Sequence, residues 1–120
     1  MNLKILIVDD EVDVLEFQRC YLQRRKYQVF TAFNTPKALE VFNKESPSIV
    51  FLDLRLETDT RGLEILEGIK KTKPDTVVFL LTGIIDKEIE DKALALGAKE
   101  VLHKPITNEV LENKIKEAFL

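Results

Sequence analysis

The sequence has few of the residues from which cross-links and soft-metal sites are built. It contains one cysteine, Cys20, and one histidine, His103, among 120 residues. A lone cysteine excludes an intramolecular disulfide, which fits a reducing compartment. One cysteine and one histidine cannot form a thiolate metal site. A long apolar run is also missing, because Asp9 and Asp10 interrupt the first one. That run is too short for a signal peptide or a membrane span, so we expect a cytoplasmic protein with no membrane partner.

An excess of basic residues is missing as well. The net charge is −3 at pH 7, whereas binding to a nucleic acid backbone needs a basic surface. We therefore expect no direct nucleic acid partner. The hydrophobic share of 45% is ordinary for a globular protein. Because no linker or low-complexity stretch interrupts the chain, we expect residues 1–120 to form one domain, whether it stands alone or belongs to a longer protein.

Short apolar runs alternate along the chain with segments of helical periodicity. The runs are continuous and rich in β-branched residues, which is typical of strands buried on both faces of a parallel sheet. They are residues 5–8, 29–30, 49–52, 77–81 and 101–102. The segments between them have apolar residues at helical spacing, namely Val14, Phe17 and Tyr21, then Ala38, Leu39 and Phe42, then Leu63, Leu66 and Ile69, then Ile89, Ala93 and Leu96, and finally Leu111, Ile115 and Phe119. This alternation predicts an α/β fold with helices on both faces of the sheet.

Two helix boundaries are marked by residue type. Thr35 precedes Pro36, which is typical of an N-cap followed by proline at the first helical position. Gly97 follows the fourth helical segment, where a C-terminal cap residue is expected. We therefore predict that one helix begins after Thr35 and that another ends before Gly97.

Reactive side chains follow four of the five predicted strands. Asp9 and Asp10 come after the first strand, Asp53 after the third, Thr82 after the fourth and Lys104 after the fifth. Ligands of open parallel sheets bind beyond the carboxyl ends of the strands. We therefore expect these five side chains to lie at one edge of the sheet.

Each of these residues alone has an ordinary structural explanation. Asp10 could cap the following helix, Thr82 suits a strand, and Lys104 could be a solvated loop residue. Together, however, three carboxylates repel one another unless a cation lies among them, and oxygen ligands of this kind suit Mg²⁺. A metal, a lysine and a hydroxyl are also what a transferring phosphoryl group needs. The set therefore indicates phosphoryl chemistry, in which a carboxylate can be the nucleophile.

The ordered motifs resemble those of receiver domains of two-component response regulators. They are ILIVDDE at residues 5–11, FLDL at 51–54, LTG at 81–83 and KP at 104–105. The resemblance covers the whole chain. It implies a flavodoxin-like (βα)5 fold, a three-layer sandwich with strand order 2-1-3-4-5.

The resemblance also implies a site and a role for each residue in it. Asp53 would be the phospho-acceptor. Asp10 and Asp53 would bind Mg²⁺ directly, Asp9 would act through water, and Arg55 would contribute its backbone carbonyl, with Mn²⁺ as a substitute metal.

Further roles concern the phosphoryl group and the switch. Thr82 and Lys104 would contact the phosphoryl oxygens, and the Lys104–Pro105 peptide bond would be cis. Thr82 and the position of Val101 would form the switch. The family usually has an aromatic residue at that position, so Val101 is a departure. In a second departure, Glu57 replaces a proline and Gly62 comes nine positions after Asp53 rather than eight.

The implied partners are a sensor histidine kinase or phosphotransfer protein as donor, and an output domain or protein downstream. Homodimer formation on phosphorylation is also implied. The chain would not be an enzyme, but a switch that assists only its own phosphorylation and dephosphorylation. A degenerate receiver that only binds proteins is the main alternative, although it would normally lack an acid, the lysine or the acceptor.

Two alternatives come from other functional classes. A flavodoxin-like cofactor binder would need a phosphate-cradling loop after the first strand, where this chain has Asp9, Asp10 and Glu11. A phosphatase that forms an aspartyl phosphate would need an acid two positions after its nucleophile, where Asp53 is followed by Arg55. Both alternatives therefore fit the sequence less well.

Overall fold

Continuous apolar strands form the centre of the protein, as the sequence predicts. The computed structural model describes residues 3–120. Five parallel strands lie in the order β2-β1-β3-β4-β5, which confirms the order implied by the resemblance. They are β1 (Lys4–Val8), β2 (Gln28–Ala32), β3 (Ile49–Asp53), β4 (Val77–Thr82) and β5 (Glu100–His103). The helices are α1 (Val12–Arg24), α2 (Thr35–Glu45), α3 (Arg61–Thr72), α4 (Lys87–Ala95) and α5 (Asn108–Phe119).

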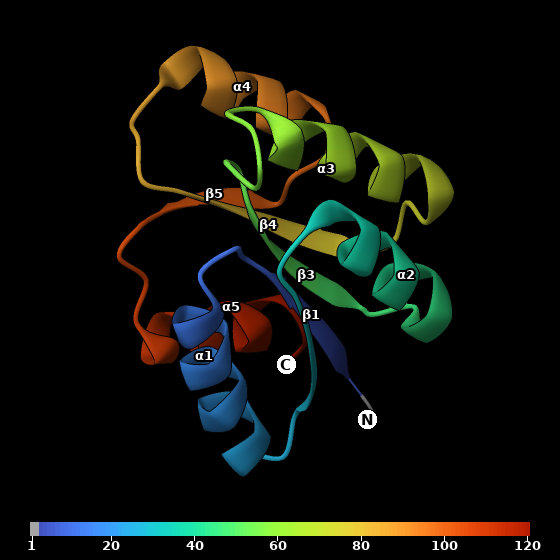
Figure 1. Ribbon diagram of the computed structural model, residues 1–120, viewed down its shortest axis with the longest axis vertical. Coiled ribbons are helices and arrows are strands. Elements are labelled where there is room, and N and C mark those ends of the chain that lie inside the picture. The colour runs from blue at the N-terminus through green and yellow to red at the C-terminus, as the bar shows by residue number, and fades with distance from the viewer. Residues whose placement is uncertain (1–2) are drawn as a thin grey trace.

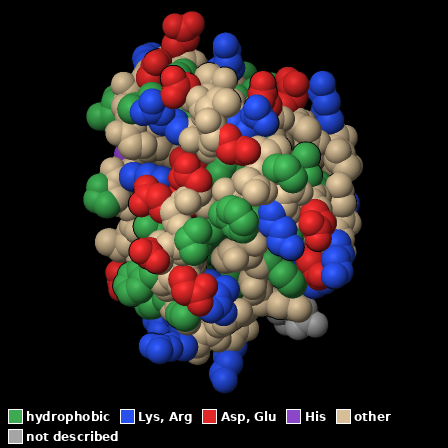
Figure 2. Space-filling view, in the orientation of Figure 1, with side chains coloured by type: hydrophobic (Ala, Val, Ile, Leu, Met, Phe, Trp, Pro, Cys, Tyr) green, Lys and Arg blue, Asp and Glu red, His purple; other side chains and the backbone are tan. Residues whose placement is uncertain are grey.

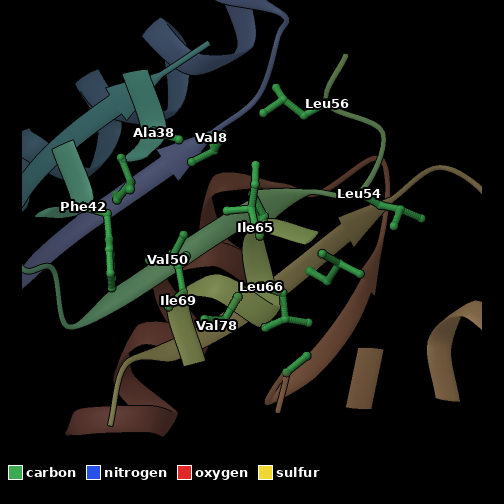
Figure 3. Close-up of a cluster of buried hydrophobic side chains, with 14 of the residues drawn as sticks. Val8, Ala38, Phe42, Val50, Leu54, Leu56, Ile65, Leu66, Ile69 and Val78 are labelled. Carbon is green, nitrogen blue, oxygen red and sulfur yellow. The ribbon is translucent and has the colours of Figure 1, made fainter. Parts of the chain in front are cut away.

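Helices cover both faces of the sheet and give the expected three layers (Figure 1). On one face, α2, α3 and α4 pack against the strands around a cluster that includes Phe42, Leu66 and Val78 (Figure 3). On the other face, α1 and α5 cover a second cluster, in which the rings of Phe51 and Phe79 stack with centroids 5.3 Å apart. No helix within residues 3–120 is long and apolar enough to cross a membrane.

Strand register brings the predicted site residues together. Val8 of β1 pairs with Leu52 of β3, so the residues that follow them, Asp9 and Asp53, leave the sheet side by side. Asp53 in turn lies opposite Leu81 of β4. The reactive ends of three central strands therefore share one edge of the sheet.

The buried face of α1 differs from the predicted one. Leu15 and Leu22 face the sheet together with Gln18, whereas Phe17 is 71% exposed and Val14 and Tyr21 are only partly buried. The helix is therefore turned by one residue, about 100°, from the stripe expected at Val14, Phe17 and Tyr21. The sequence places Leu15 and Leu22 beside the expected stripe, and the polar Gln18 between them interrupts the apolar pattern of the face that is buried.

The start of α2 also differs from the prediction by one residue. The N-cap is Asn34, whose side chain accepts a hydrogen bond from the Lys37 amide at 2.9 Å. Thr35, expected to be the cap, is already the first helical residue. The prediction for Gly97 is confirmed, because this residue follows α4 with φ of 109°, in the left-handed region that glycine adopts freely.

Gly62 is required by a close approach of backbones. It lies at the start of α3, and its amide donates to the Leu54 carbonyl at 2.8 Å. A Cβ atom added here would lie 2.6 Å from the Leu54 Cα and 2.7 Å from the Asp53 carbonyl oxygen. These are backbone atoms, so no side-chain rotation can relieve the contact. The position allows only glycine because α3 begins directly against the end of β3.

We predict opposite effects for the same substitution at two positions of α3. Gly62→Ala should lower the free energy of unfolding by about 1–3 kcal/mol, because the methyl group forces backbone to shift. Gly68→Ala, where an added Cβ meets nothing within 4 Å, should raise it by about 0.5–1 kcal/mol through better helix propensity. Urea denaturation of both variants measures the two effects, and equal effects would contradict the close approach.

Candidate functional site

Three carboxylates meet at the carboxyl edge of the sheet, where the sequence predicts them. Ligand atoms of Asp9, Asp10 and Asp53 all lie within 4.8 Å of one another. Asp9 is 1% exposed and Asp53 6% exposed, whereas Asp10 lies at the surface. Asp9 and Asp53 are held by strand register, while Asp10 begins the turn into α1. The structure therefore brings together two buried acids and one exposed acid.

Lys104 contacts both buried acids. Its Nζ atom lies 3.0 Å from Oδ2 of Asp9 and 3.5 Å from Oδ2 of Asp53. Burial by itself would lower the pKa of Lys104, but the hydrogen bond to Asp9 and the charges of Asp53 and Asp9 outweigh it and raise the pKa. The Lys104–Pro105 peptide bond is cis, as the resemblance implies. The Lys104 backbone is held by a hydrogen bond from its amide to the Thr82 carbonyl at 2.7 Å. Lys104 is therefore a fixed cation at the acidic edge.

Asp53 occupies an unfavourable electrostatic environment. Burial raises the pKa of its carboxyl group, and the nearby charges of Asp9 and Asp10 raise it further. Lys104 opposes this effect, as does the Arg55 amide, which donates to Oδ1 of Asp53 at 3.2 Å. The net direction is upward, so the ionised carboxylate is held at a cost to the fold. A cation placed among the three acids would remove that cost.

The arrangement fits a hard divalent cation. Both carboxylate oxygens of Asp9 already accept hydrogen bonds, Oδ1 from the Glu11 amide at 3.0 Å and Oδ2 from Lys104 at 3.0 Å. Asp10 is exposed. On Asp53, Oδ1 accepts a hydrogen bond from the Arg55 amide and Oδ2 lies 3.5 Å from Lys104 Nζ. Mg²⁺ binds few protein carboxylates and keeps several waters. The three acids together therefore form a donor set that suits Mg²⁺.

The remaining predicted residues surround this core of the site. Thr82 is 2% exposed, and its hydroxyl accepts a hydrogen bond from the Ile84 amide at 3.1 Å. Val101 is half-buried and packs against the α2–α3–α4 cluster, as does Ile84. The Arg55 side chain points away to Asp59, with Nη2 and Oδ1 2.9 Å apart. Of the Arg55 backbone, the amide is the group that contacts Asp53.

One contact near the site was not predicted from the sequence. Glu57, in the loop after Asp53, accepts a hydrogen bond from the Thr35 amide at 2.9 Å and another from the Thr35 hydroxyl. The sequence marked Glu57 as unusual, because it stands where the resemblance leads us to expect a proline. The sequence could not show that Glu57 contacts Thr35, which is 22 positions away.

The molecular surface mixes both signs of charge. Acidic and basic side chains alternate over the face seen in Figure 2, with apolar side chains between them. This distribution agrees with the small net charge of −3. The face seen in Figure 2 therefore differs from the basic stripe that a nucleic acid requires.

Comparisons with known proteins find similarity over nearly the whole chain. The family model described as the response regulator receiver domain matches residues 5–116. Sporulation initiation phosphotransferase F from Bacillus subtilis is 30% identical over 117 residues, which cover 98% of this chain and 94% of that protein. A cyclic di-GMP phosphodiesterase from Thermotoga maritima is 33% identical over 115 residues, which cover 96% of this chain but only 30% of that protein. This chain thus corresponds to under a third of the Thermotoga protein.

The solved structures give the same result for the fold. A response regulator receiver domain protein (CheY-like) from Methanospirillum hungatei superposes with a TM-score of 0.90 at 30% identity, covering 98% of this chain and 93% of that one.

We predict that metal-free stability responds to the charge on Asp53. Because the folded pKa is raised above the unfolded value, the ionised form destabilises the fold, and this cost disappears as the pH falls through the raised pKa. In EDTA, Asp53→Asn should therefore melt a few degrees above wild type at pH 7, and the difference should shrink toward pH 4. Thermal unfolding at several pH values measures it. A constant or opposite difference would contradict the electrostatic assignment.

We also predict unequal contributions of two acids to metal binding. Asp10→Asn should weaken Mg²⁺ binding more than Asp9→Asn, because losing a direct ligand costs more than losing a supporting group. Calorimetric titration of both variants with Mg²⁺ measures the two dissociation constants. Equal losses would show that the ligand roles are wrongly divided.

Proposed function

Since this chain belongs to the response regulator receiver domain family, we propose that in the cytoplasm it accepts a phosphoryl group on Asp53 in a Mg²⁺-dependent reaction. The donor is a phosphohistidine on a sensor kinase or phosphotransfer protein. One observation carries the proposal: Lys104 lies against Asp53 and Asp9 while Asp10 completes an acidic cluster at the same edge. All four groups that the chemistry needs are present, which disfavours a degenerate receiver.

The transfer forms one bond and breaks one bond. A carboxylate oxygen of Asp53 attacks the phosphorus atom, the phosphorus–nitrogen bond breaks, and the histidine nitrogen leaves with the electron pair. The product is an acyl phosphate. Lys104 places its charge beside the incoming phosphoryl oxygens, and the Thr82 hydroxyl can donate to them after it leaves the Ile84 backbone. Mg²⁺, when bound by Asp10 and Asp53, supplies further positive charge to the same oxygens.

The same residues suggest how the signal leaves the site. The Thr82 hydroxyl is bonded to Ile84, so its movement toward a phosphoryl group would pull the loop that leads into α4. Val101 has a short, stiff side chain, so the change would be carried by that loop rather than by an aromatic residue on β5. The face formed by α4, β5 and α5 would then contact the output partner or a second copy of the chain.

The chain would act as a switch that assists only its own phosphorylation and dephosphorylation. Output would come from another domain or protein, since part of the curated relatives' length lies outside the matched region.

The expected outcome is a single phosphoryl group on Asp53. Wild-type protein treated with acetyl phosphate and Mg²⁺ should gain the mass of one phosphoryl group in intact-protein mass spectrometry, and EDTA should prevent it. Asp53→Asn is the matched control, because the amide keeps the shape but is not a nucleophile. Equal phosphorylation of the Asn variant, or phosphorylation in EDTA, would refute the assignment.

A further inference from the structure

The loop between Asp53 and α3 contains a strained turn. The Thr58 amide donates to the Leu56 carbonyl at 2.7 Å, so Glu57 is the central residue of a three-residue turn. Its φ is 66°, as in the classic γ-turn, which is rare and strained. Side chains other than glycine and asparagine seldom adopt this conformation. Something outside the turn must therefore hold Glu57 there.

The Glu57 carboxylate makes the contact that can do so. It accepts from the amide and the hydroxyl of Thr35, the first residue of α2. These hydrogen bonds lower the pKa of Glu57, and the amide is one that the helix itself cannot satisfy. The negative charge also lies at the positive end of the helix. Glu57 therefore ties the loop after Asp53 to a second element.

The end of α2 is a firm attachment point. Asn34 caps the next free amide, that of Lys37, at 2.9 Å. Further along the helix, Ala38 and Phe42 are almost fully buried against the sheet (Figure 3). A loop bound to this end of α2 is therefore held by the core of the protein.

The residues between Asp53 and Glu57 connect the Glu57–Thr35 contact to the acidic site. Leu54 and Leu56 are fully buried, and the Leu54 amide donates to the Leu81 carbonyl at 2.8 Å. Arg55 lies between these anchors and donates its amide to Asp53. The expected metal ligand in this loop is the Arg55 carbonyl, two positions before Glu57. Leu56 alone separates Arg55 from Glu57, so a change in the turn would reach that carbonyl through the Leu56 backbone.

We propose that Glu57 is a positioning residue for the phosphoryl-acceptor site: by binding Thr35 at the start of α2, it holds the Arg55 backbone where the Mg²⁺ site needs it. The inference rests on the proposed function and assigns to it a residue outside the acidic cluster. Glu57 does not touch the reacting atoms and acts only through the loop.

The test compares metal affinity with stability. Glu57→Ala should weaken Mg²⁺ binding about tenfold, the lower end of what loss of an outer-shell partner costs. The phosphorylation rate with acetyl phosphate should fall at low Mg²⁺ and return close to wild type at saturating Mg²⁺. Glu57→Gln, which keeps an oxygen acceptor for Thr35, should recover most of the affinity. Calorimetry and mass spectrometry give the two readouts.

Asn34→Ala is the matched control, because it removes the other cap of α2 without touching the loop. It should lower the melting temperature and leave Mg²⁺ affinity unchanged. If Glu57→Ala behaves in the same way, Glu57 is only a helix cap and the inference is wrong. Should Glu57→Ala fold poorly, Glu57→Gly removes the carboxylate while allowing φ of 66°, and unchanged Mg²⁺ affinity in it would overturn the inference equally.

The wild-type protein separates this inference from the proposed function. Wild type that neither binds Mg²⁺ nor accepts a phosphoryl group would refute the proposed function, and the inference with it. If wild type binds Mg²⁺ and accepts a phosphoryl group, and Glu57→Ala binds Mg²⁺ with the same affinity as wild type, the inference is refuted and the proposed function is not.

Discussion

The contact of Lys104 with two buried carboxylates is the interaction on which the site depends. Asp9 and Asp53 are placed side by side because the register of β1 and β3 pairs Val8 with Leu52, the residues before them. Lys104 offsets part of the cost of this placement, but the pKa of Asp53 stays raised, chiefly because its carboxyl group is buried and also because Asp9 and Asp10 carry the same charge. The fold thus holds its reactive group in a less stable state, which is common where a site must bind a further ion or group. In the proposed function, Mg²⁺ would offset the charge of the carboxylates, and Lys104 would offset that of the phosphoryl group.

Much of the fold and of the site could be predicted from the sequence. Continuous apolar runs marked the strands because both faces of a parallel sheet are buried. The reactive residues came directly after those runs, and parallel strands bring their carboxyl ends to one edge. The strand order itself came from the resemblance, since periodicity does not say which strands are neighbours.

Other features depend on contacts that local patterns do not contain. The orientation of α1 was wrong by one residue because Gln18 is a polar residue on the buried face. The N-cap of α2 was placed at Thr35 rather than Asn34 because both residue types cap helices well. The contact between Glu57 and Thr35 joins residues 22 positions apart, and only the folded backbone places them together. The first error lies where tertiary packing overrides a local pattern, and the second where two adjacent residues have similar capping preferences.

The lack of space for a side chain at Gly62 limits how the loop between β3 and α3 can accommodate inserted residues. One end of the loop is fixed where Leu54 leaves the sheet, and the other where α3 begins against the same backbone. An inserted residue cannot lengthen β3 or lift α3 without disturbing both, so it must bulge outward between them. The left-handed turn at Glu57 lies in the middle of this span. An insertion would therefore change the direction in which Glu57 points toward Thr35, even while the strand end and the helix start keep their positions.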